Sequence, residues 1–146
     1  MTTVTDGLNG LAADAMVMYQ KLHHYHWNIA GDEFFSLHIK FEELYNYFSV
    51  VLDDVAERVL TVGGTPPRTL GEVLEKASIE EDPGLPADDE DFVKNIMNDF
   101  NALLASSLVV VEAAEAARDR GTVTLLDDFR TQLEKHVWML RSYLKD

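Results

Sequence analysis

The sequence contains no cysteine among its 146 residues. Disulfide bonds, thiolate nucleophiles and cysteine-held zinc or iron–sulfur sites are therefore excluded. Any metal ion that the chain binds must be held by histidine and carboxylate side chains. This absence directs the search for functional residues to those two side-chain types.

Basic residues are also scarce, because 12 Lys and Arg stand against 26 Asp and Glu, for a formal net charge of −14. No Lys or Arg precedes Lys21, and residues 144–146 form no basic tail. DNA binding draws on neutralised phosphates, so direct DNA binding is disfavoured. The hydrophobic share of 47% is too high for a disordered acidic chain, and the length predicts a single domain over residues 1–146.

Long apolar runs are missing as well. No stretch approaches the roughly 18 apolar residues of a membrane span. Residues 1–10 lack the positive region and apolar run of a signal peptide. We therefore expect a cytoplasmic protein without a membrane partner.

Apolar residues recur every three or four positions in four long segments, which predicts helices over about 6–28, 35–61, 88–120 and 122–145. Gly63 and Gly64 end the second helix, and Gly121 separates the third from the fourth. The connection of about 27 residues between the second and third helices is far longer than a helix turn and contains a short amphipathic segment, 69–77. The predicted fold class is all-α: a ferritin-like four-helix bundle with a short extra helix in the long crossover between helices two and three.

Histidine is concentrated in one part of the chain, because four of the five histidines fall within residues 23–38. Carboxylates follow on the second predicted helix, and the combination of imidazole with carboxylate suits iron, manganese or zinc. No Glu is followed three residues later by His, whereas di-iron bundles carry that Glu-x-x-His motif. A di-iron centre inside one bundle is therefore disfavoured.

The carboxylates and histidines form two pairs on the second helix. His38 and Glu42 share one face, as do Asp53 and Glu57, because four positions separate the members of each pair. At about 1.5 Å per residue the pairs lie about 22 Å apart, so one chain cannot close both on one metal ion. An antiparallel second chain would bring Asp53 and Glu57 opposite His38 and Glu42, and a short connection brings His26 near them.

Four motifs together resemble the signature of the Dps miniferritins, the DNA-protection-during-starvation proteins. They are His-Trp-Asn-Ile-Ala-Gly at 26–31, Phe-Phe-Ser-Leu-His at 34–38, Asp-Asp-Val-Ala-Glu-Arg at 53–58 and Gly-Gly at 63–64. The resemblance spans almost the whole chain. It implies a hollow dodecamer that oxidises Fe²⁺ with hydrogen peroxide or O₂ and stores ferric oxide, which protects against oxidative damage.

The resemblance also implies roles for individual residues. His26 and His38 would be metal ligands and catalytic residues from one subunit, and Asp53 and Glu57 those from its two-fold partner. Glu42 stands where the family commonly has Asp, so a direct bond and a water-mediated contact to the metal are both open. Zinc or manganese could substitute for iron.

Further candidates stand beside the predicted site and at the start of the last helix. Trp27 is a candidate electron donor, with core or interface packing as the alternative. Asp119, Asp127 and Asp128 flank the region where the resemblance implies a three-fold pore for iron entry, and the alternative there is a solvated helix N-terminus. We expect hydrogen-bonded or packing roles for His23, His24 and His136.

Two other functions stay open at this point. The first is DNA binding and compaction, for which the family is named, and the second is a helical assembly protein without catalysis.

Overall fold

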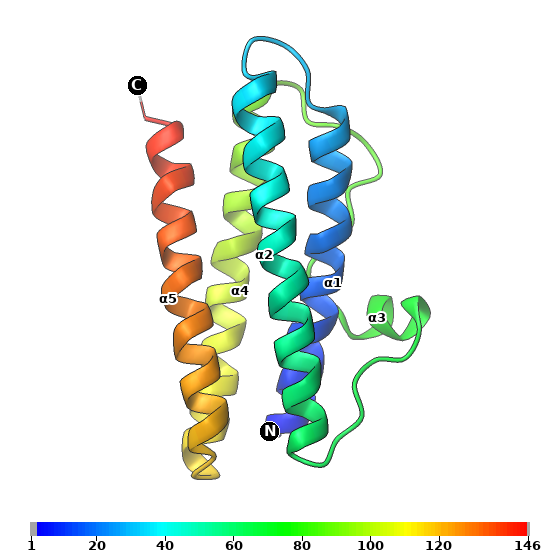
Figure 1. The fold of residues 1–146 in the computed structure, drawn as a ribbon, viewed down its shortest axis with the longest axis vertical. Coiled ribbons are helices and arrows are strands. Elements are labelled where there is room, and N and C mark those ends of the chain that lie inside the picture. Colours follow the sequence, from blue (N-terminus) through cyan, green and yellow to red (C-terminus); the bar gives the residue numbers. More distant parts are fainter. Residues whose placement is uncertain (1–2, 146) are drawn as a thin grey trace.

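The structure is a computed structural model that describes residues 3–145. These residues form α1 (Val4–Asn28), α2 (Phe34–Thr61), α3 (Leu70–Lys76), α4 (Asp89–Ala116) and α5 (Arg120–Tyr143), with no strand in the described part. The four long helices run side by side, with the α1–α2 and α4–α5 turns at opposite ends of the bundle (Figure 1). This confirms the predicted fold class.

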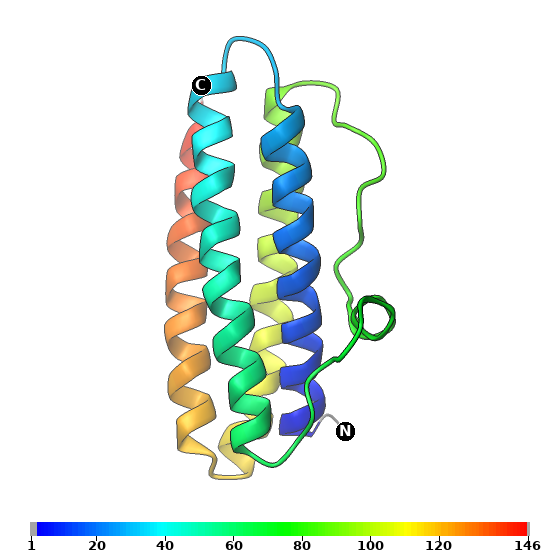
Figure 2. The same cartoon turned by 45° about the vertical axis from the view of Figure 1, so that its right-hand side comes forward.

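The crossover between α2 and α4 returns the chain along the whole length of the bundle (Figure 2). It carries α3, which lies beside α1 and outside the four-helix core. Because the crossover returns to the other end, α4 starts near the end of α1 and runs antiparallel to α5. This is the connectivity of a ferritin-like bundle.

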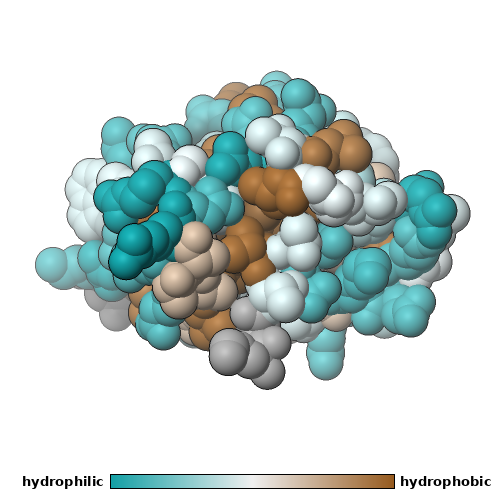
Figure 3. Space-filling model, turned by 90° about the horizontal axis from the view of Figure 1, so that it is seen from below, coloured by the Kyte–Doolittle hydropathy of each residue, from teal (hydrophilic) through white to brown (hydrophobic). Residues whose placement is uncertain are grey.

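The core follows from the helical spacing of the apolar residues. Phe41 and Phe48 of α2, Phe100 of α4 and Leu133 of α5 are fully buried between the helices. Each such side chain contributes about 1.5–3 kcal/mol when it leaves water. Hydrophobic residues also reach the surface between hydrophilic ones at the end of the bundle seen in Figure 3.

Among the described residues, α4 alone is long and apolar enough in composition to span a membrane. The expectation that no segment approaches a membrane span therefore does not hold for α4 by length and composition. Phe92, Ile96, Phe100 and Leu103 of this helix are buried against its neighbours. Packing within the bundle accounts for part of the apolar character of α4, because 33% of its most apolar window is buried, while Leu108 and Val109 remain exposed.

The predicted boundary between the last two helices was wrong. We expected helices over 88–120 and 122–145, but α4 ends at Ala116 and α5 begins at Arg120. Arg118 adopts a left-handed conformation with φ of 55°, and the next amide, at Asp119, donates to the Ala114 carbonyl at 2.8 Å. This pattern ends a helix without glycine.

Gly121 consequently lies in the first turn of α5, where a side chain would meet the end of the Arg58 side chain. A Cβ at this position would come within 2.5 Å of Nη2 of Arg58, which reaches over from α2. Arg58 donates to Asp119 at 2.7 Å and to the Thr122 hydroxyl at 3.0 Å. A larger residue at this position would displace Arg58 from these two partners, so the glycine favours an interhelix contact and does not mark a helix end.

A buried acid holds the crossover against α1. The Asp14 side chain is only 2% exposed and accepts hydrogen bonds from the Ser78 amide (2.7 Å), the Ser78 hydroxyl (2.9 Å) and the Ile79 amide (2.9 Å). Further along, Lys21 donates to the Glu80 carbonyl at 2.9 Å. These bonds satisfy backbone groups that no helix or strand pairs.

Candidate metal centre

The turn between α1 and α2 brings two predicted ligands together. His26 lies in the last turn of α1, and His38 lies near the start of α2. Gly31 takes a φ of 102° in the turn between them, a conformation that glycine adopts without strain. The two imidazole rings stack with centroids 3.7 Å apart and an angle of 13° between their planes.

Each of these histidines is oriented by the other's backbone. Nδ1 of His26 bonds to the His38 carbonyl at 2.6 Å, and Nδ1 of His38 bonds to the His26 carbonyl at 2.7 Å. Because a carbonyl only accepts, both Nδ1 atoms carry the proton and donate it. In the neutral form of each ring, Nε2 then carries a free lone pair, and this is the form that binds a metal ion.

Glu42 lies next to this histidine pair. Its Oε1 is 3.9 Å from Nε2 of His26, and it accepts a hydrogen bond of 3.4 Å from the Tyr45 hydroxyl. The pKa of Tyr45 is raised, first by desolvation and then by the Glu42 carboxylate, so the phenol keeps its proton and donates it. The structure thus places His26, His38 and Glu42 side by side at one end of α2.

Asp53 and Glu57 form a second group further along α2. Both side chains are exposed, and neither makes an ion pair with any residue in the range 3–145. The pKa of Glu57 is raised by its hydrogen bond with Asp53 and by the negative charges of Asp53 and Asp54. Two adjacent carboxylates without a cationic neighbour favour a bound cation.

The described part of a single chain does not close a metal site. Within residues 3–145, no three His, Asp or Glu side chains are placed to hold one metal ion. The fifteen residues from His38 to Asp53 separate the two groups by about 22 Å of helix. The five candidate ligands therefore lie in two separate groups, and neither group alone is a complete metal site in the described residues.

Tyr45 is a neighbour of this site that sequence reasoning missed. Its ring meets His26 edge-on with centroids 5.2 Å apart, and it stacks on His23 at 3.6 Å. The spacing of three residues from Glu42 to Tyr45 puts both on one helix face and could have identified it.

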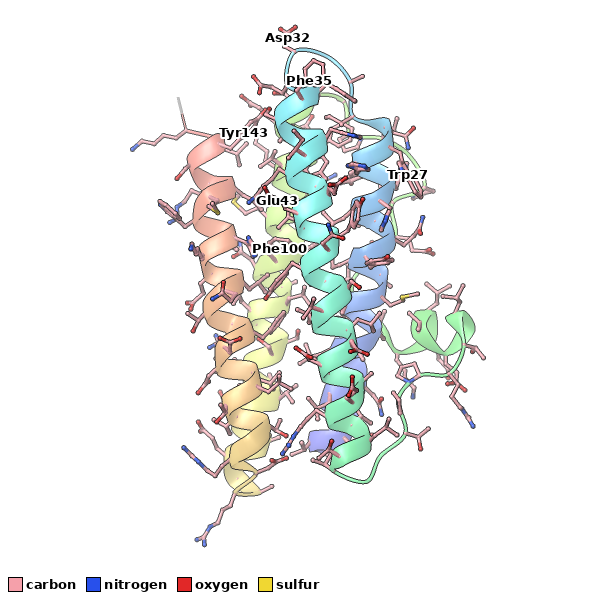
Figure 4. The ribbon with its side chains drawn as sticks, viewed as in Figure 1. Trp27, Asp32, Phe35, Glu43, Phe100 and Tyr143 are labelled. Atoms are coloured by element: carbon pink, nitrogen blue, oxygen red, sulfur yellow. The ribbon has the colours of Figure 1, made fainter. Side chains whose placement is uncertain are left out.

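Trp27 is 61% exposed and lies near the end of α1, on the side away from α5 (Figure 4). Its ring contacts the ring of His23 at 5.2 Å. No ring contact joins Trp27 to His26 or His38 within residues 3–145. The Trp27 ring therefore lacks a ring contact with the candidate histidines in the described residues, although its backbone adjoins that of His26.

The remaining histidines have local partners or packing roles, as expected. Nδ1 of His23 bonds to the Tyr19 carbonyl at 2.7 Å, and Nε2 of His24 bonds to the Gly84 carbonyl at 2.6 Å. His136 packs on the rings of Tyr47 and Phe100.

Burial lowers the pKa of His136 from 6.5 to about 4. The unfolded chain takes up a proton near 6.5 while the folded chain stays neutral, so stability is lost as the pH falls from 6.5 towards 4. We expect His136→Phe to flatten the decline of Tm between pH about 7 and about 4.5. An unchanged decline in the variant would show that other groups govern this pH range.

The three pore candidates differ in their surroundings. Asp119 caps α5 by accepting from the Thr122 amide at 3.1 Å, and it pairs with Arg58 at 2.7 Å. The Thr122 and Arg58 hydrogen bonds hold the pKa of Asp119 below its ordinary value despite partial burial. Asp127 and Asp128 are exposed on the third turn of α5. Only the latter two carboxylates are free of partners within the described chain.

The all-α bundle, its long crossover and its histidine–carboxylate groups define a ferritin-like protein. A family model described as a ferritin-like domain matches residues 5–146. The chain is 46% identical to a DNA protection during starvation protein from Brevibacillus brevis over 138 residues, which cover 94% of this chain and 92% of that protein.

Solved structures agree with this relationship. The crystal structure of a Dps protein from Bacillus brevis has a TM-score of 0.95 at 43% identity, covering 99% of this chain and 100% of that one. A second match is the crystal structure of a Dps protein from Vibrio cholerae, with a TM-score of 0.93 at 37% identity. The match covers 97% of this chain and 89% of that one. That protein is described as a member of a broad superfamily of ferritin-like diiron-carboxylate proteins. The chain belongs to the Dps family, and these relationships favour a Dps-type oligomeric assembly.

Proposed function

We propose that this protein oxidises ferrous iron at sites formed between two subunits and stores the product as ferric oxide inside a hollow dodecamer. Hydrogen peroxide is the proposed oxidant, with O₂ as the alternative. Iron is here the substrate and cargo. The activity would make the protein a cytoplasmic ferroxidase that protects against oxidative damage.

One observation carries the proposal: His26 and His38 donate their Nδ1 protons to each other's carbonyls at 2.6 and 2.7 Å. With Nδ1 as the donor, Nε2 of each neutral ring is left to bind a metal ion, and the Glu42 carboxylate lies 3.9 Å from Nε2 of His26. The donor set of imidazole and carboxylate suits Fe²⁺ and stabilises the higher charge of Fe³⁺. Zinc and manganese accept the same ligands and are the expected competitors.

The second group of candidate ligands completes the proposed centre. An isologous dimer with antiparallel α2 helices would place Asp53 and Glu57 of one subunit opposite His26 and His38 of the other. Metal binding would also relieve the repulsion that raises the Glu57 pKa. The two-fold symmetry then gives two equivalent sites for each dimer.

The chemistry needs little beyond these ligands. Two ferrous ions each lose one electron, and one peroxide molecule takes both electrons and two protons to become two water molecules. Pairing the electrons in this way avoids release of a hydroxyl radical. The exposed Asp127 and Asp128 would attract Fe²⁺ towards an entry pore if three subunits meet near the start of α5.

The proposal is tested by adding Fe²⁺ and hydrogen peroxide to the purified protein. The amount of Fe²⁺ per subunit is chosen to exceed the number of proposed oxidation sites. We expect rapid formation of ferric absorbance and co-elution of the iron with the protein on a desalting column. Iron that precipitates as fast as in protein-free buffer would contradict the proposal.

DNA compaction is the second candidate function, because the relatives carry DNA protection in their names. The net charge of −14 opposes it. We expect no retardation of duplex DNA in a gel-shift assay at moderate salt without divalent cations. Clear retardation under these conditions would favour the DNA-binding function. A helical assembly without catalysis is the third candidate, and normal iron oxidation would exclude it.

A further inference from the structure

We infer that Tyr45 is the first electron donor to a stray one-electron oxidant at the metal centre, and that His23 couples it to Trp27 at the surface. The inference rests on the proposed ferroxidase function. It assigns the electron supply to a tyrosine instead of to Trp27 alone.

Tyr45 is the aromatic residue of this group that touches the candidate ligands. Its hydroxyl donates to Oε1 of Glu42 at 3.4 Å, and its ring meets the His26 ring edge-on at 5.2 Å. Within residues 3–145, no ring contact joins Trp27 to His26. Through ring contacts, an electron from Trp27 would have to pass through His23 and Tyr45, whereas Tyr45 itself adjoins a candidate ligand.

His23 bridges the two candidate donors. Its ring stacks on Tyr45 with centroids 3.6 Å apart and planes inclined by 19°, and on its other side it meets Trp27 at 5.2 Å. The hydrogen bond from Nδ1 to the Tyr19 carbonyl at 2.7 Å holds the imidazole in this position. The three rings form a continuous path from the metal centre to the exposed indole.

The proposed step applies when only one ferrous ion meets hydrogen peroxide. That ion supplies one electron, which leaves a hydroxide ion and a hydroxyl radical. The hydroxyl radical takes one electron from Tyr45 and becomes a second hydroxide ion, while the phenolic proton passes to the Glu42 carboxylate. The product is a neutral tyrosyl radical. One electron from Trp27, through His23, and the proton held by Glu42 return it to tyrosine, which leaves a one-electron-oxidised Trp27.

Packing alone is the competing role for these rings. It would explain the stacking of His23 on Tyr45, but it gives no reason for the phenol to point its hydroxyl at a candidate ligand. The two roles differ in their consequences, because packing predicts no radical on Tyr45.

The experiment freezes the assembled protein after mixing it with hydrogen peroxide and less than one Fe²⁺ per proposed site, and records its electron paramagnetic resonance spectrum. We expect a tyrosyl signal in the parent protein and its loss in Tyr45→Phe, with more hydroxyl radical captured by an added spin trap. Tyr47→Phe is the matched control, because Tyr47 lies on the same helix but stacks on Phe129 and His136. This control should keep the tyrosyl signal.

Two further variants test the proposed roles of Trp27 and His23 in electron transfer separately. Trp27→Phe should keep the tyrosyl signal and prolong its lifetime, and His23→Leu should reduce oxygen insertion into Trp27 as measured by mass spectrometry. A tyrosyl signal that persists in Tyr45→Phe, together with normal iron oxidation, would overturn the inference but leave the proposed function intact. A parent protein that oxidises no iron would overturn both.

Discussion

Replacement of Asp53 by Asn should lower the initial rate of Fe²⁺ oxidation by about 100-fold or more, because loss of a ligand's hydrogen-bonding partner alone costs about 10–100-fold. The substitution removes the negative charge that stabilises Fe³⁺ and keeps the size of the side chain. His38→Ala should act as strongly, since it removes one Nε2 ligand and also the hydrogen bond that orients the His26 backbone. Stopped-flow absorbance of the ferric product measures both rates.

Asp54→Asn is the matched control for this prediction. Asp54 is an exposed acid on the same helix and one residue further on, so it points about 100° away around the helix axis. Its replacement removes the same charge but should leave the oxidation rate near that of the parent. If Asp53→Asn oxidised Fe²⁺ at the same rate as the parent, with assembly size unchanged, Asp53 would not be a ligand of the proposed site.

Replacement of Asp14 by Ala should lower the free energy of unfolding by about 3 kcal/mol, because three hydrogen bonds to a buried carboxylate are lost together. The amides of Ser78 and Ile79 would then lack an acceptor. For a chain of this length the change corresponds to a decrease in Tm of about 6–12 °C. Circular dichroism at a fixed subunit concentration measures it, since assembly makes Tm depend on concentration.

Asp32→Ala serves as the control for the Asp14 variant. Asp32 lies exposed in the turn between α1 and α2, so its replacement should change Tm by less than about 2 °C. A Tm for Asp14→Ala that matches this control would show that the crossover does not depend on the buried acid. The iron-oxidation rate of both variants should follow the fraction of folded protein.

The main features of the fold could be predicted from the sequence because apolar spacing determines which face of each long helix is buried. The boundary between α4 and α5 could not be predicted. A glycine such as Gly121 commonly indicates a helix end, and its contact with the Arg58 side chain of α2 depends on how the helices pack. The attachment of the crossover was likewise hidden. Asp14 falls inside a helix and bonds to a segment more than sixty positions away, which no local pattern reveals.

The candidate site was partly predictable for the same reasons. Spacing of four residues places His38 with Glu42 and Asp53 with Glu57 on shared faces of α2. The mutual hydrogen bonds of His26 and His38 could not be predicted, because they depend on the path of the turn at Gly31. The contact of Tyr45 with His23 depends on how α1 packs against α2, which spacing within either helix does not determine.

The central claim is that two subunits together build each iron site, and mixed assemblies test it most directly. One variant carries His26→Ala and His38→Ala, and the other carries Asp53→Ala and Glu57→Ala. Each assembly alone should be inactive. If the two variants are unfolded and reassembled together in equal amounts, every mixed two-fold dimer regains one intact site.

Random pairing should then restore about one quarter of the parental number of sites and a similar share of the oxidation rate. Parent protein carried through the same unfolding and reassembly fixes the reference rate. Recovery near one quarter would establish sites shared between subunits. Two variants that are inactive apart and stay inactive when co-assembled in verified mixed dimers would contradict the account, because ligands within one chain cannot be complemented by another.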